Sequence, residues 1–125
     1  PAVKPWDVET SPPLKRTCQK TDSGRLHIGW FQPYAAVRYH ETNTTFGFET
    51  HAEHEISLED PKSARSYFDH RMVFERQDGT AMVRCAGTAT CDHTHYHLEG
   101  WLEATWDAEE VTRKAWKVST ERRLS

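Results

Sequence analysis

The stretch from Cys91 to Gly100, CDHTHYHLEG, places histidines at three alternate positions and a glutamate two residues after the last of them. On a β-strand, His93, His95 and His97 would share one face, with neighbouring side chains about 6.5 to 7 Å apart. Two imidazoles at this spacing can bind one metal ion, because each nitrogen needs to come within only ~2.0 to 2.1 Å of it. The pattern fits a metal site, an acid/base group or a polar strand face.

The opposite face of the same strand is the more apolar one, since it carries Tyr96, Leu98, Leu102 and Ala104. We therefore expect the three histidines to point outward as a polar strand face, without a bound metal and without any cofactor. A transition-metal site formed by His93, His95 and His97 is the alternative interpretation, and an acid/base role for one of them is another.

Two further histidines, His54 and His70, interrupt rows of apolar residues. An imidazole on an inward face must find a partner or reach solvent, because burying it unpaired is costly. Each could be a satisfied core histidine. If instead both open onto one internal cavity, either would suit general acid or base catalysis near neutral pH.

The same inward rows supply the rest of the candidate site. Tyr39 and Tyr96 are inward hydroxyls that could donate to a developing oxyanion, so they join His54 and His70 as candidate catalytic residues. Aromatic side chains could simply fill the interior, or they could enclose an apolar small molecule. The candidate ligand-binding residues are Trp30, Phe46, Phe48, Phe68, Met72, Phe74, Trp106 and Trp116.

The elements that would position these residues are strands, because apolar residues alternate with period 2 and no segment keeps a 3.6-residue period over three turns. Expected strands cover residues 25–31, 35–39, 44–58, 65–76, 80–91, 92–106 and 111–120. Asp78-Gly79 is a hairpin signal that would pair Phe74 with Val83 on a buried face. The prediction is an all-β fold of seven or eight antiparallel strands, a jelly-roll-like sandwich or a flattened, lipocalin-like barrel.

Composition and charge indicate the domain organisation, the classes of partner and the redox compartment. Residues 1–13, which include Pro5, Pro12 and Pro13, are expected to form an extended arm before one β domain over residues 14–125. The net charge of −3 and the absence of long Lys/Arg runs argue against nucleic acid or membrane partners. Three cysteines, with Cys85 and Cys91 about 20 Å apart on one strand, indicate a reduced, cytoplasmic protein. A homo-oligomer is left open.

Four short motifs follow one another in the second half: SLEDPKSA at 57–64, CDHTHYHL at 91–98, LEA at 102–104 and AWKV at 115–118. In this order they resemble the C-terminal jelly-roll domain of cocaine-esterase-type, X-prolyl-dipeptidyl-peptidase-like hydrolases, which carries a DPxSA turn and T-H-aromatic-H, L-x-A and W-x-V strands. The resemblance covers about residues 55–124 and implies a jelly-roll fold.

The departures from that family limit what it implies about function. The family usually ends in an I-P-R-D segment, where this chain has Thr120-Glu121-Arg122-Arg123. Its chemistry lies in a separate α/β-hydrolase domain with a G-x-S-x-G nucleophile elbow, and this sequence has no G-x-S-x-G. No hydrolase residue is carried over, so function must be argued from the site.

Three functions are compatible with these observations. The preferred one is a small stand-alone enzyme that performs cofactor-free acid/base chemistry (isomerase, cyclase, hydratase or lyase type) on a hydrophobic small molecule held in an aromatic-lined cavity. The second is a non-catalytic binder of such a molecule. The third is an accessory or oligomer-forming β-module derived from a hydrolase.

Overall fold

The computed structural model describes residues 5–21 and 23–123, which form eight β-strands and no helix. The all-β prediction is confirmed. No helix in the described ranges is long and apolar enough to cross a membrane. The strands are β1 Trp6–Thr10, β2 Lys15–Lys20, β3 Arg25–Tyr39, β4 Thr44–Ser57, β5 Asp60–Arg76, β6 Gly79–Cys91, β7 His95–Trp106 and β8 Glu109–Glu121.

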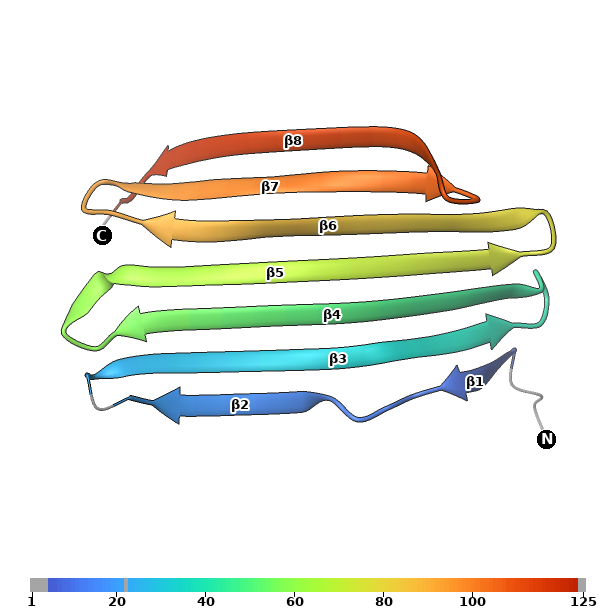
Figure 1. The fold of residues 1–125 in the computed structure, drawn as a ribbon, viewed down its shortest axis with the longest axis horizontal. Coiled ribbons are helices and arrows are strands. Elements are labelled where there is room, and N and C mark those ends of the chain that lie inside the picture. Colours follow the sequence, from blue (N-terminus) through green and yellow to red (C-terminus); the bar gives the residue numbers. More distant parts are fainter. Residues whose placement is uncertain (1–4, 22, 124–125) are drawn as a thin grey trace.

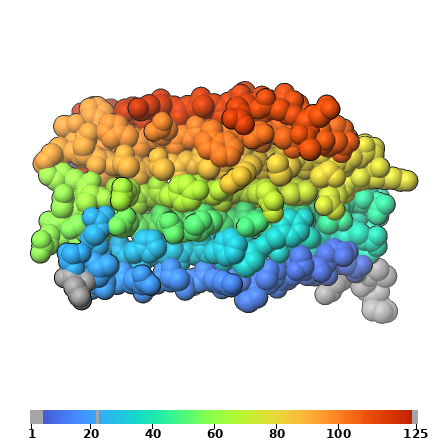
Figure 2. Space-filling model, viewed as in Figure 1, coloured from blue at the N-terminus to red at the C-terminus, as the bar shows by residue number. Residues whose placement is uncertain are grey.

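All eight strands belong to one open antiparallel sheet with the order β1-β3-β4-β5-β6-β7-β8, and β2 pairs with β3 beside β1. Figure 1 shows this single layer, in which β3 to β8 follow one another as a meander. The space-filling view shows the same order as successive bands (Figure 2). Within the described residues, each strand contacts only strands that pair with it.

The expected sandwich or barrel is therefore corrected to an open sheet. A sandwich needs a second layer and a barrel needs its first and last strands to pair, and neither occurs among the described strands. Alternation along a strand separates an apolar from a polar face, but it carries no information on what covers the apolar one.

The two faces follow from the register, because directly opposed residues in an antiparallel pair share a face. One row across the sheet runs through Val37, Phe46, Phe74, Ala81 and Trp106. We call the face that contains this row the apolar face, and the other one the polar face. Most of the apolar face consists of Leu26, Ile28, Trp30, Ala35, Val37, Tyr39, Phe46, Phe48, Ala52, Ile56, Phe68, Met72, Phe74, Ala81, Val83, Cys85, Tyr96, Leu98, Leu102, Ala104, Trp106, Trp116 and Val118.

The sheet has almost no interior. In the described part of the chain, the buried apolar residues are four alanines, and no large side chain is fully buried. Phe68 on β5 and Trp116 on edge strand β8, both on the apolar face, are 40% and 41% exposed. A folded chain of this length normally buries about two thirds of its surface around one core. The apolar face is thus the equivalent of a core that lacks its covering layer.

Aromatic rings on the apolar face lie against glycines of the neighbouring strand. A Cβ atom at Gly87 would lie 2.9 Å from the ring of Phe68, and one at Gly100 would lie 3.0 Å from the ring of Trp116. The glycines therefore leave space that the rings occupy close to the backbone. This arrangement gives the apolar face a low relief around these two rings.

Three strand boundaries differ from the expected ones. Residues 25–31 and 35–39 form one strand, β3, because Pro33 lies in an irregularity between Gln32 and Ala35 that the ladder tolerates. Strand β5 starts at Asp60 and so includes Pro61 close to its first residue, where a missing N–H costs little. Part of the expected N-terminal arm is strand β1; residues 1–4 of the arm lie outside the described residues.

The β5–β6 hairpin is confirmed, with a different register. Arg76 pairs with Gly79 and Phe74 with Ala81, so the loop is Gln77-Asp78 and Val83 pairs with Met72. The partners are shifted by two residues, which preserves the face. Phe74 and Val83 consequently share the apolar face, as expected.

Candidate functional site

All the predicted catalytic and ligand-binding residues lie at register positions of the apolar face. Within that face, Phe46 contacts Phe74 at 5.0 Å and Phe48 at 5.8 Å between ring centroids. The period-2 pattern thus identified one face correctly. The surface it forms is open, however, where an enclosed cavity was expected.

The two candidate imidazoles are each bonded to a hydroxyl on the opposed strand. His54 Nδ1 lies 2.8 Å from Ser66 Oγ, and His70 Nδ1 is bonded to Thr50 Oγ1. Because His70 pairs with Thr50, His54 and His70 are offset by four residues along the strands, which is about 13 Å. They share a face without sharing a pocket.

The two tyrosines lie far from each other and from a common centre. Tyr39 packs against Trp6 at the β1 edge, with ring centroids 6.4 Å apart. Tyr96 lies beneath the guanidinium of Arg122, which is 5.4 Å from its ring centroid. Strands β3 and β7 are four spacings apart, or about 19 Å. One small substrate would not reach both hydroxyls.

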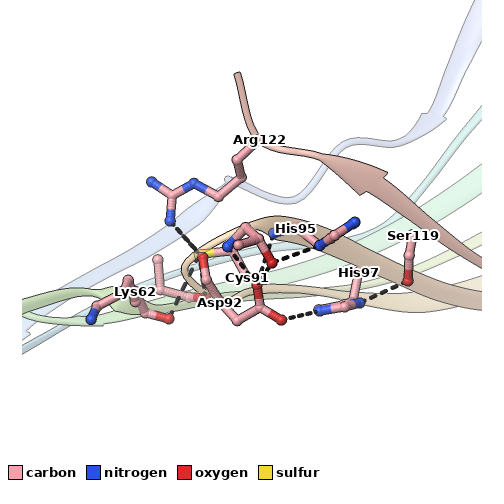
Figure 3. A network of polar contacts seen from close by, with 9 residues as sticks. Lys62, Cys91, Asp92, His95, His97, Ser119 and Arg122 are labelled. Atoms are coloured by element: carbon pink, nitrogen blue, oxygen red, sulfur yellow. Dashed lines mark hydrogen bonds and ion pairs between the residues drawn. The ribbon is translucent and has the colours of Figure 1, made fainter. Parts of the chain in front are cut away.

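A polar network that sequence reasoning missed lies around Asp92, where β7 begins and β8 ends (Figure 3). Oδ1 of Asp92 accepts the backbone N–H groups of Thr94 and His95, both at 2.8 Å. Oδ2 lies 2.8 Å from His97 Nε2, and His97 Nδ1 lies 2.8 Å from Ser119 Oγ. Hydrogen bonds to the carboxylate, first of all from His97, hold the pKa of Asp92 well below its usual range.

The order Asp92–His97–Ser119 has the residue types of a serine-hydrolase triad. Its setting is different, since the His97 and Asp92 side chains are 40% and 53% exposed. A triad also needs an oxyanion hole and a pocket beside the serine, and the hollows described in this structure are lined elsewhere. The network joins the β6–β7 turn to edge strand β8 through side-chain hydrogen bonds. Its sequence signal is the Asp-x-Thr turn at Asp92.

Of the three alternating histidines, one lies in the β6–β7 turn and two lie on β7. His95 and His97 lie on the polar face, as expected, with ring centroids 6.2 Å apart. His93 lies in the β6–β7 turn beside Lys62, whose Nζ is 2.5 Å from Nε2, so its expected place in the strand was wrong. Within the part of the chain that the structure describes, no three His, Cys, Asp or Glu side chains are grouped as metal ligands.

We expect the purified protein to contain no stoichiometric transition metal and its melting temperature to be unchanged by a chelator. The reason is that His97 is engaged at both ring nitrogens and His93 points to an ammonium group. Elemental analysis is the measurement. About one zinc, nickel, manganese or iron per chain, lost together with a His95→Ala substitution, would contradict this expectation and restore the histidine site.

The charges on the apolar face are mostly positive and lie at its periphery. We call this set the cationic rim: Arg16 and Lys20 on β2, Arg76 at the end of β5, Lys114 on β8, and Arg122 above Tyr96. Among the described residues, the carboxylate at a register position of this face is Glu109, opposite Trp106. Arg76 also has Asp78 of the turn 3.8 Å away. The apolar face is thus surrounded by an excess of cations.

Comparisons with protein-family models, with curated proteins and with solved structures found no match to this chain.

Proposed function

We propose that this chain is an accessory β-module whose apolar face docks against a protein partner, and that it works without a catalytic centre of its own. The observation that carries the proposal is the aromatic face of a one-layer sheet, on which Phe68 and Phe74 of the central strand β5 are 40% and 38% exposed. Large exposed apolar patches mark interaction surfaces on soluble proteins. The motif resemblance over residues 55–124 adds no support, because the described strands form one open sheet where it implies a jelly roll. The reduced, cytoplasmic setting is retained as part of the proposal.

The area of the face is sufficient for a stable complex. The sheet path crosses seven strands, so its width is six spacings, or about 29 Å. Strands of 12 or 13 residues such as β6 to β8 are about 40 Å long. The face therefore offers about 1,200 Å² per partner, compared with about 800 Å² in an interface of standard size.

The cationic rim favours a partner other than a second copy. In a face-to-face dimer whose two-fold axis runs along the strands, β2 lies over β8 of the other copy, which brings Arg16 and Lys20 near Lys114 and Arg122. With the axis across the strands, β2 lies over β1 of the other copy, because β1 and β2 pair with different ends of β3. The β1 residues on the apolar face, Trp6 and Val8, offer Arg16 and Lys20 no carboxylate. Like charges at a rim disfavour a pairing, whereas opposite charges favour it. The proposed partner is a protein surface that is apolar at its centre and carries carboxylates at its periphery.

The low relief of the face favours a packed protein layer over a membrane. Phe68 and Trp116 lie against Gly87 and Gly100, close to the backbone. Layers of secondary structure pack about 10 Å apart through such interdigitating surfaces. The acid/base hypothesis for His54 and His70 has less support, because the two imidazoles share no hollow and each is bonded to a hydroxyl.

The first test uses two dyes with the same aromatic framework, anionic anilinonaphthalene sulfonate and neutral N-phenylnaphthylamine. A folded, monomeric chain should bind both, because the apolar face is accessible, and should prefer the sulfonate because of the rim. Trp116→Ser should weaken both dyes, and Phe31→Ser, an aromatic residue on the polar face outside the binding surfaces proposed for this chain, is the control. Lys114→Glu should reduce the preference for the sulfonate up to about fivefold, since a charge pair at 4 Å is worth ~1 kcal/mol in water. Lys15→Glu, on the polar face of β2, should not.

Sedimentation analysis and partner binding complete the test. Products of neighbouring genes are the candidate partners, and the partner should displace the dye with a salt-sensitive affinity. A stable dimer that binds no dye would assign the face to a second copy. Co-sedimentation with phosphatidylglycerol vesicles would assign it to a membrane. Either result overturns the proposal.

A further inference from the structure

The polar face carries an open trough over β5 to β8, with a volume of about 660 Å³. This volume lies within the range of small-ligand sites, roughly 300 to 1,000 Å³. Its floor is low because Trp101 is flanked by alanine on both neighbouring strands, Ala86 on β6 and Ala115 on β8. The side chains that rise around the floor are Tyr67, Asp69, Arg84, Glu99, Trp101 and Lys117.

The aromatic walls are held in place by polar contacts. The Tyr67 hydroxyl donates to Asp69 Oδ2 at 3.3 Å, and the same carboxylate accepts Arg84 Nη2 at 2.7 Å and Nε at 3.1 Å. The guanidinium of Arg84 in turn lies 5.7 Å from the ring centroid of Trp101. Tyr67, Asp69, Arg84 and Trp101 therefore form one chain of contacts, which orients both rings before any ligand arrives.

The charges of the trough cancel. Asp69 is paired with Arg84, and Glu99 stands directly opposite Lys117 in the β7–β8 ladder. An anion site would need surplus cations and a cation site surplus carboxylates, so the trough has no net attraction for either. Donors on Arg84 and Lys117 alternate with acceptors on Asp69 and Glu99. Such a set matches neighbouring hydroxyl groups, which donate and accept at once.

We propose that this trough binds a neutral oligosaccharide. A pyranose ring combines an apolar C–H surface, which packs on the negative face of an aromatic ring, with equatorial hydroxyls that bond to paired charged groups. The trough is open to solvent, so a chain longer than the site can bind there. The site lies on the face opposite the proposed docking surface, so it stands independently of the proposed function.

Isothermal titration with four neutral hexasaccharides (cellohexaose, xylohexaose, mannohexaose and maltohexaose) tests the proposal on the full chain. At least one should bind at micromolar to millimolar affinity and change the tryptophan fluorescence. Trp101→Ala should weaken it about tenfold or more, because aromatic anchors carry much of the affinity of such sites. Trp30→Ala, on the apolar face, is the matched control and should leave binding unchanged.

One substitution and one anionic ligand test the role of the paired charges in the trough. Glu99→Gln keeps the shape and should weaken binding less than Trp101→Ala does. The anionic hexamer of galacturonic acid should bind more weakly than the neutral oligosaccharides. Circular dichroism checks that each variant is folded. Absence of binding for all four neutral hexasaccharides, preference for the anionic hexamer, or undiminished binding by folded Trp101→Ala would each overturn the proposal.

Discussion

Gly87→Ala is expected to lower the free energy of unfolding by about 1–2 kcal/mol. A Cβ atom at this position would lie 2.7 Å from the backbone carbonyl oxygen of Glu99 and 2.9 Å from the ring of Phe68. The oxygen belongs to the adjacent strand, so it can move only if the β6–β7 ladder opens locally. Overpacking of this kind costs ~1–3 kcal/mol, and removing the conformational freedom of glycine in the unfolded chain recovers ~0.5–1 kcal/mol.

Urea unfolding followed by circular dichroism measures this change as a lower midpoint at an unchanged slope. Thr88→Ala is the control, because the next residue along β6 is exposed on the polar face; its effect should stay below about 1 kcal/mol. An unchanged or raised midpoint for Gly87→Ala would mean that β6 and β7 do not approach as closely as described.

Asp69→Asn should destabilise the sheet by about 1 kcal/mol near neutral pH and by progressively less in acid. Hydrogen bonds from Arg84 hold the pKa of Asp69 below its usual range. A carboxyl group with a lowered pKa in the folded state contributes stability above its unfolded pKa of ~3.9 and loses it as the pH falls through the folded value. The estimate is small because Arg84 is 47% exposed and water screens the pair.

The measurement is the difference in unfolding free energy between the parent chain and Asp69→Asn at several pH values. The difference should be constant from neutral pH down to about pH 5 and should shrink below ~pH 4. The parent chain should itself lose stability over the same interval, because the pKa values of Glu55 and Asp92 are also lowered by hydrogen bonds. Glu59→Gln, in the exposed β4–β5 turn, is the control. A difference that persists in strong acid would place the effect in packing instead of charge.

Which residues share a face could be predicted from the sequence, because period-2 alternation is a local property of each strand. His54 and His70 were correctly assigned to the face that carries Phe46 and Phe68. That residues 5–21 and 23–123 form no second layer could not be predicted. Alternation is the same whether an apolar row is covered by the chain's own strands, by a partner or by nothing. A cavity around the two histidines was therefore inferred although no second layer encloses them in the described structure.

The pairing of Ser119 with His97 in the polar network was unpredictable for a different reason. Trp106 pairs with Glu109 across the turn, and if the ladder continued without interruption, His97 would stand opposite Val118. An irregularity beside Thr105 leaves Val111 unpaired and moves Ser119 opposite His97. The same extra residue puts Trp116 and Val118 on the apolar face. The unpaired residue Val111 therefore determines both the contact of Ser119 with His97 and which side chains of β8 lie on the apolar face. No turn or propensity signal in the sequence marks Val111 as unpaired.

Because each described strand contacts only its partners in the ladder, the stability of the sheet is a chain of nearest-neighbour terms, as in repeat proteins. Opening β8 costs only the β7–β8 contacts, so amide hydrogen exchange should be fastest at the two edges and slowest in β4 and β5. A layer packed across the apolar face would touch several non-adjacent strands at once. Docking would then do more than cover aromatic side chains: it would make strands that now open one by one unfold together.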